Sequence, residues 1–91
     1  MTHAVVLVQA ERSALADLGP ALADLDGVAE VYSVTGDWDF VAMVRLREHA
    51  QLAGLVTERL SKLDGIARTQ TMVAFEVYSR HDLEALFSVG Q

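Results

Sequence analysis

Two kinds of hydrophobic pattern alternate along the chain and predict its elements. Residues 4–8 and 40–44 are apolar at every position, which is typical of strands buried on both faces. Residues 52–63 instead place leucine and valine at the three- and four-residue spacing of a helix with one buried side. Continued along the chain, the patterns predict strand, helix, strand, strand, helix and strand over residues 3–10, 17–25, 28–35, 39–46, 48–63 and 66–79.

A short internal repeat groups these elements into two halves. The pentapeptide LDGVA at residues 25–29 returns 38 residues later as LDGIA at residues 63–67, a spacing that holds a whole βαβ unit. Gly27 and Gly65 follow the helical patterns, where a left-handed residue often ends a helix. Two such units predict an α+β, ferredoxin-like βαββαβ fold, with a four-stranded antiparallel sheet and both helices on one face.

The first helix and the end of the chain leave alternatives open. Pro20 clashes in a helix interior, so it either lies in the first turn or kinks a helix that begins near Ser13. Ser79 and Asp82 have the spacing of a capped helix start. We therefore expect residues 80–91 to form a C-terminal helical tail, which either docks on its own domain or packs on a neighbouring subunit.

Two helices cover only one face of a four-stranded sheet, yet the strands at residues 4–8 and 40–44 are apolar on both faces. The chain is 52% hydrophobic, which suggests more apolar surface than one copy covers. A second copy packed sheet against sheet would form a dimeric α+β barrel. A monomer covered by its tail and an exposed ligand-binding face are the alternatives.

Composition and charge exclude several classes of function. With 13 acidic and 7 basic residues the net charge is −6, and the basic residues are not clustered, which argues against autonomous nucleic-acid binding. The chain has no cysteine, and His3, His49 and His81 lie too far apart for a metal site. No segment has the length of a membrane span or of a signal-peptide core. We therefore expect a cytoplasmic protein without cofactor or metal.

The densest polar and aromatic cluster, Gly36, Asp37, Trp38 and Asp39, connects the second and third predicted strands. It is either a tight connection, with Gly36 at positive φ, the carboxylates bonded to nearby backbone amides and the indole at the core edge, or a ligand site. In the second case Gly36 lets a small molecule approach the backbone, a carboxylate accepts an ammonium group and Trp38 covers an apolar part.

Two threonines of the last predicted strand are further candidates. Thr69 and Thr71 are two residues apart and therefore share one face of that strand. Their hydroxyl groups could bond a ligand carboxylate. Threonine is also an ordinary strand residue, so both interpretations stay open.

Four segments together resemble one known family: LDGV at residues 25–28, VYSVTGDWD at 31–39, LDGI at 63–66 and RTQT at 68–71. In this order the chain resembles, over residues 1–79, the effector-binding or RAM domain of the Lrp/AsnC (feast/famine) transcriptional regulators. The resemblance implies homodimers that pair through their sheets and assemble into larger even-numbered oligomers, with amino acids or related metabolites bound between dimers. It also implies that Gly36, Asp37, Trp38 and Asp39 line the effector site, with Thr69 and Thr71 as its polar floor.

One departure from the family pattern changes the expected function. A full regulator carries an N-terminal helix-turn-helix, whereas the first predicted strand here begins close to Met1. We therefore expect a stand-alone, non-enzymatic sensor domain that makes no direct contact with DNA. It would modulate transcription through its own oligomerisation or by co-assembly with a full-length Lrp/AsnC regulator. The alternatives are a small dimeric barrel enzyme of the monooxygenase or isomerase kind, which the aliphatic inward positions disfavour, and a purely structural assembly module.

Overall fold

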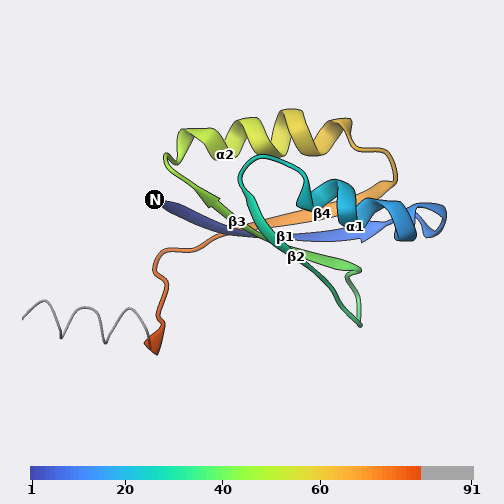
Figure 1. Cartoon of the computed structure of the whole chain (residues 1–91), viewed down its shortest axis with the longest axis horizontal. Coiled ribbons are helices and arrows are strands. Elements are labelled where there is room, and N and C mark those ends of the chain that lie inside the picture. Colours follow the sequence, from blue (N-terminus) through green and yellow to red (C-terminus); the bar gives the residue numbers. More distant parts are fainter. Residues whose placement is uncertain (81–91) are drawn as a thin grey trace, which may run out of the picture.

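A computed structural model describes residues 1–80, which form one four-stranded antiparallel sheet with the helices on one side (Figure 1). The strands are β1 (Thr2–Ala10), β2 (Val28–Ser33), β3 (Phe40–Leu46) and β4 (Ile66–Val73). They lie in the order β2-β3-β1-β4, so that the first strand of each half is central and the second is an edge strand. The predicted ferredoxin-like α+β fold is confirmed.

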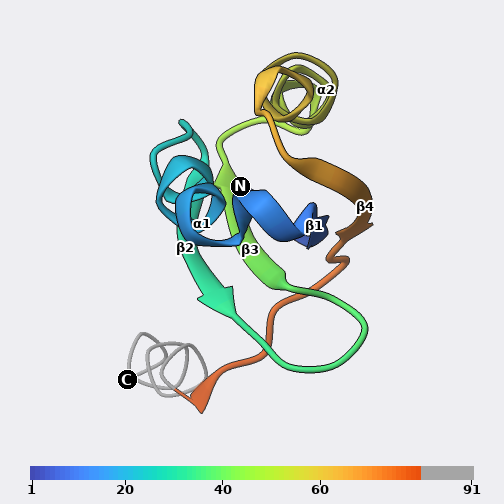
Figure 2. The same ribbon diagram turned by 90° about the vertical axis from the view of Figure 1, so that its right-hand side faces the viewer.

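The core lies between the sheet and the two helices (Figure 2). Alternate residues of β1 and β3 point into it and are fully or nearly fully buried, because successive side chains of a strand point to opposite faces. The buried residues of the sheet and helices are all apolar: Ala4, Val6, Val8, Leu18, Leu22, Phe40, Ala42, Val44, Leu46, Leu52, Leu55 and Leu60. Among residues 1–80 the core therefore contains only apolar side chains.

The first helix, α1 (Leu15–Ala23), follows a short 3₁₀ turn, η1 (Arg12–Ala14), and contains Pro20 in its interior. The alternative in which the helix begins near Ser13 is therefore confirmed, and the first-turn placement of Pro20 is wrong. Because proline has no backbone N–H, the carbonyl group four residues before Pro20 has no amide partner within the helix. Pro20 is exposed, so water can reach this part of the helix. On the opposite side of α1, a Cβ at Gly19 would lie 3.1 Å from the Phe40 ring, so the helix packs closely on β3.

The second helix differs from the uniform helix predicted over residues 48–63. It consists of α2 (Ala50–Gly54), a π-helical segment η2 (Leu55–Arg59) and a 3₁₀ turn η3 (Leu60–Lys62). Leu55 and Leu60 are five residues apart, and both are buried, with 0% and 4% of their surface exposed. The wider π turn brings residues at this spacing onto one face, which a regular helix does not.

Both predicted glycine stops have positive φ, +96° at Gly27 and +91° at Gly65. Each carbonyl oxygen then accepts a backbone hydrogen bond from a central strand or its end: Arg45 N donates to Gly27 at 2.9 Å and Glu11 N donates to Gly65 at 2.7 Å. A Cβ at Gly27 would lie 2.5 Å from Leu46 Cδ2, and one at Gly65 would collide with the side chain of Ala14. The repeated pentapeptide thus fixes two equivalent helix-to-strand junctions.

The last strand ends at Val73, so its predicted extent to residue 79 is wrong. Its partner β1 begins at Thr2, and the Ala4–Val73 pair is followed by only one more hydrogen bond, from Ala74 N to the His3 carbonyl oxygen at 2.9 Å. None of residues 74–80 lies in a strand, and Phe75 is fully exposed. The helical tail predicted from residue 80 falls almost wholly on residues 81–91, outside those described.

Candidate functional site

The β2–β3 loop carries the four residues singled out in the sequence. Gly36 has φ of +107°, as predicted, and a Cβ at this position would meet no atom within 4 Å. The glycine is therefore required by the backbone conformation and not by packing, and the space beside it is open. Val34 N donates to the carbonyl oxygen of Asp39 at 3.0 Å and closes the loop.

Asp39 fastens this loop to the end of β1. The ladder between β1 and β3 ends with the pair Val8–Phe40, and one residue earlier the backbone amide of Asp39 donates to the Val8 carbonyl at 2.9 Å. The amide of Ala10 then donates to Asp39 Oδ2 at 2.8 Å, in a partly buried position. The carboxylate thus replaces a strand carbonyl, in a bond whose ionised acceptor contributes about 1.5–3 kcal/mol. The predicted partner type, a backbone amide, is correct, but it lies 29 residues away.

Trp38 and Arg68 meet at the same end of the sheet. The guanidinium carbon of Arg68 lies 4.5 Å from the centre of the Trp38 ring, a cation–π contact. Arg68 belongs to β4 and pairs with Gln9 of β1, whose side-chain amide donates to the Asp37 carbonyl oxygen at 3.3 Å. Three segments therefore build one cluster around the indole. Arg68 was not among the residues selected from the sequence, although it directly precedes Thr69.

Asp37 differs from Asp39 in its surroundings. Its backbone carbonyl is held by Gln9, but within residues 1–80 its carboxylate has no hydrogen-bond or ion-pair partner. Asp37 is exposed, whereas Asp39 is half-buried. Of the two carboxylates in the loop, the one at Asp37 is therefore available to a ligand.

Thr69 and Thr71 lie on the other face of β4. They alternate with Arg68 and Gln70 and pair with Val8 and Val6, whose side chains point into the core. Thr71 lines a hollow of about 370 Å³ beside α2, and Thr69 lines a neighbouring one of about 230 Å³. Within one chain the structure therefore brings together the loop and Arg68, and it does not bring the threonines to the loop.

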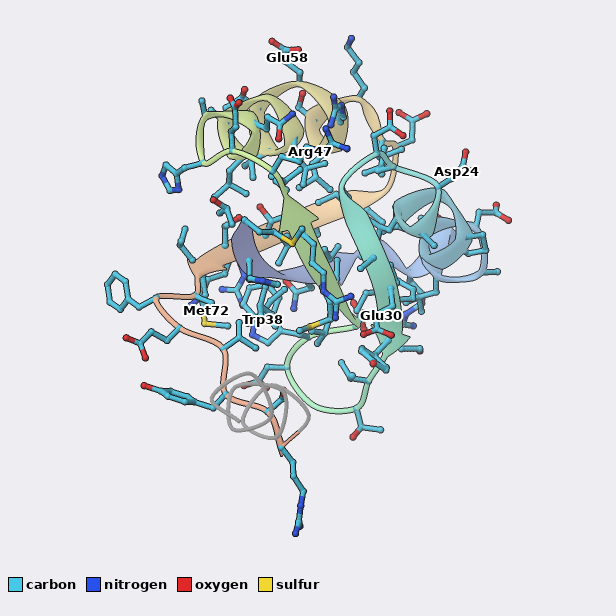
Figure 3. All side chains as sticks on the ribbon, turned by 60° about the vertical axis from the view of Figure 1, so that its left-hand side comes forward. Asp24, Glu30, Trp38, Arg47, Glu58 and Met72 are labelled. Atoms are coloured by element: carbon cyan, nitrogen blue, oxygen red, sulfur yellow. The ribbon has the colours of Figure 1, made fainter. Side chains whose placement is uncertain are left out.

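Apolar side chains occupy much of the sheet surface away from the helices, here called the open face. They are half-buried or exposed and come from all four strands: Val5, Leu7, Tyr32, Val41, Met43 and Met72. The same face also carries polar and charged side chains: His3, Gln9, Glu30, Arg45, Arg68 and Gln70. Within residues 1–80 no helix covers it, and Trp38 and Met72 both lie on this side, away from Arg47 and Glu58 beside the second helix (Figure 3). Hydrogen bonding to Glu30 and the charge of that carboxylate raise the pKa of Tyr32 at the β2 edge.

The described residues give little support to other kinds of site. They contain no group of three or more histidines, cysteines or carboxylates that could hold a metal ion. No polar or charged residue is buried among residues 1–80, so the core there offers no titratable group. None of the helices in the same range is long and apolar enough to cross a membrane.

Comparison with known proteins identifies the family of this chain. The family model for the Lrp/AsnC ligand binding domain matches residues 3–83. The HTH-type transcriptional regulator PF0250 of Pyrococcus furiosus is 34% identical over 59 residues, which are 65% of this chain and 39% of that regulator. The chain thus spans about two fifths of the length of this curated relative.

Solved structures agree with this assignment. TTHA0845 of Thermus thermophilus has a TM-score of 0.81 and 45% identity, over 88% of this chain and 100% of that one. The transcriptional regulator NMB0573 of Neisseria meningitidis, solved in complex with L-Met, shares the fold with a TM-score of 0.77 and 15% identity, over 87% of this chain and 53% of its own. By its sequence match and its fold, the chain belongs to the Lrp/AsnC ligand-binding domain family.

Proposed function

We propose that this domain binds an amino acid or a related small metabolite at the β2–β3 loop, and that binding controls its assembly with other copies and with transcriptional regulators. The observation that carries the proposal is that the two carboxylates of the loop have different hydrogen-bond partners. Asp39 is bonded to the backbone of β1 and holds the loop, while Asp37 is exposed and unpaired within residues 1–80, beside the open space at Gly36.

The chemistry of the loop suits an ammonium group with an apolar part next to it. The Asp37 carboxylate accepts the ammonium hydrogens, Gly36 allows close approach to the backbone, and the half-buried Trp38 indole covers the apolar part. The L-Met complex of the Neisseria regulator, which has the same fold, is consistent with a ligand of this class.

The site on one chain is open, and a second copy would complete it. The four hollows described on the surface lie among helix residues and the strands next to them, and none is lined by residues 36–39. Thr69 and Thr71 face away from the loop of their own chain, so they would join a site only from a neighbouring copy. Pairing of two open faces into a dimeric barrel, followed by association of dimers, is the assembly we propose.

Ligand binding would regulate the domain because it is thermodynamically coupled to the association of its copies. A ligand held between copies favours the oligomer that completes its site. The curated relatives are HTH-type regulators, and the net charge of −6 disfavours direct DNA contact, so we propose that this cytoplasmic domain reaches promoters by assembling with a full-length Lrp/AsnC protein. The apolar core of the described residues supports a non-catalytic role, since it offers no acid or base for an enzyme.

The single tryptophan of the chain gives a direct test, because Trp38 lies in the proposed site. Each of the common L-amino acids is titrated while Trp38 emission is recorded, and calorimetry confirms the hits. We expect saturable binding of a subset of amino acids, weakened about tenfold or more in Asp37→Asn, which keeps the size of the side chain but removes its charge. Wild-type protein that binds none of them, or Asp37→Asn with unchanged affinity, would contradict the proposal.

A further inference from the structure

We propose that Arg68 binds the carboxylate of the ligand and thereby restricts the loop to molecules that carry a carboxylate next to an ammonium group. This inference rests on the proposed function and adds a specificity-determining residue to the same site. The loop by itself would accept any small molecule with an ammonium group. Arg68 narrows the ligands to free α-amino acids and excludes amines and amino-acid amides.

The guanidinium of Arg68 packs on the indole of Trp38. Arg68 lies over the Trp38 ring with 4.5 Å between its central carbon and the ring centre. A guanidinium donates its hydrogen bonds in its own plane, and stacking on an aromatic ring leaves these donors free. Arg68 is therefore held in place by Trp38 and still able to bind a carboxylate with two parallel hydrogen bonds.

Arg68 has no competing anion in the described part of the chain. Asp39 Oδ2 accepts a hydrogen bond from the Ala10 amide, and neither Asp39 nor Asp37 forms an ion pair with Arg68 within residues 1–80. Arg68 is exposed, so no burial forces it to find an internal partner. Within residues 1–80 an unpaired cation thus contacts Trp38 and an unpaired anion belongs to the residue directly before it, in a protein that carries nearly twice as many acidic as basic residues.

Gln9 connects the strand that carries Arg68 to the loop that carries Asp37. Gln9 pairs with Arg68 across the β1–β4 ladder, and its side chain donates to the Asp37 carbonyl oxygen at 3.3 Å. A zwitterion matches this arrangement, with its ammonium group on Asp37, its carboxylate on Arg68 and its side chain against Trp38. A ligand without a carboxylate would leave Arg68 unpaired and lose a charge-assisted contact.

The test compares ligands and variants in one series. The tightest-binding L-amino acid from the Trp38 titration is measured against its own carboxamide, first with the wild-type protein and then with Arg68→Gln and Arg68→Lys. We expect the wild type to prefer the free acid by about tenfold to a hundredfold. Arg68→Gln should lose most of this preference, and Arg68→Lys should keep part of it, since a lysine retains the charge but not the planar pair of donors.

Controls separate this role from general damage. Arg47→Gln removes the same charge on the side of the second helix, away from Trp38 (Figure 3), and should leave the preference unchanged. Thermal unfolding and sedimentation of Arg68→Gln verify fold and oligomer. A wild type that binds acid and amide equally, or a folded Arg68→Gln that keeps the preference, overturns the role of Arg68 alone. A wild type that binds no amino acid overturns the proposed function and this inference together.

Discussion

Asp39 is the residue on which the candidate site depends, although we assign it no contact with the ligand. Its carboxylate bonds the Ala10 amide at 2.8 Å and so holds the loop against the neighbouring strand. Asp37, two residues earlier, makes no such contact through its side chain within residues 1–80. Two carboxylates in one short loop therefore have different roles, one structural and one open to a ligand.

Substitution should separate these two roles. Asp39→Ala leaves a partly buried amide without a partner, which should lower the free energy of unfolding by about 1–3 kcal/mol and weaken amino-acid binding as the loop loosens. Asp37→Ala should weaken binding while stability stays within about 0.5 kcal/mol of the wild type. Chemical denaturation and calorimetry on both variants measure this, and equal stability of the two variants would refute the assignment.

At the scale of elements, each half of the fold contains one glycine junction that packs against the other half. Gly27 and Gly65 combine positive φ with close packing against Leu46 and Ala14. Gly54 of the second helix differs from both. It has helical backbone angles, and a Cβ at this position would meet no atom within 4 Å.

These settings predict opposite effects of the same substitution. Gly27→Ala and Gly65→Ala should each destabilise the protein by about 1–3 kcal/mol, since they add backbone strain and a steric clash. Gly54→Ala should instead stabilise it by about 0.4–1 kcal/mol through better helix propensity. Thermal unfolding of the three variants measures these changes in stability. A destabilised Gly54→Ala variant, or a Gly65→Ala variant as stable as the wild type, would be inconsistent with the described junctions.

The elements also show what the sequence could and could not predict. The apolar runs and the LDG repeat are local signals, so the order of strands and helices and the positive φ of Gly27 and Gly65 follow from them. The end of β4 depends on where β1 begins, about seventy residues earlier, and no pattern within β4 contains that information. The position of Arg68 beside Trp38 likewise depends on register across β1 and β4, whereas the loop was recognisable from its own residues.

At the scale of the whole molecule, the open face supports our proposal that a second copy covers it. Apolar side chains of all four strands lie on it without a covering element in residues 1–80. Exposed apolar patches of this kind usually mark interfaces, and a homodimer covers the same patch on both copies.

A charge in the centre of this face should therefore prevent dimer formation. Val41→Glu places an unpaired carboxylate where two sheets would meet, and we expect it to sediment as a monomer with its secondary structure retained. Gln51→Glu makes the same change of charge on the exposed surface of the second helix and should remain oligomeric. If Val41→Glu sediments like the wild type, the open face is not the dimer interface.

Native mass spectrometry of the purified protein, alone and with a mixture of the common L-amino acids, tests the central claim most directly. It reports subunit number and bound ligand in the same measurement. Even-numbered oligomers that retain an amino acid, or that change subunit number when one is added, are the predicted result. A protein that shows one unchanged state and retains none of the amino acids would contradict the account of an amino-acid-binding assembly domain.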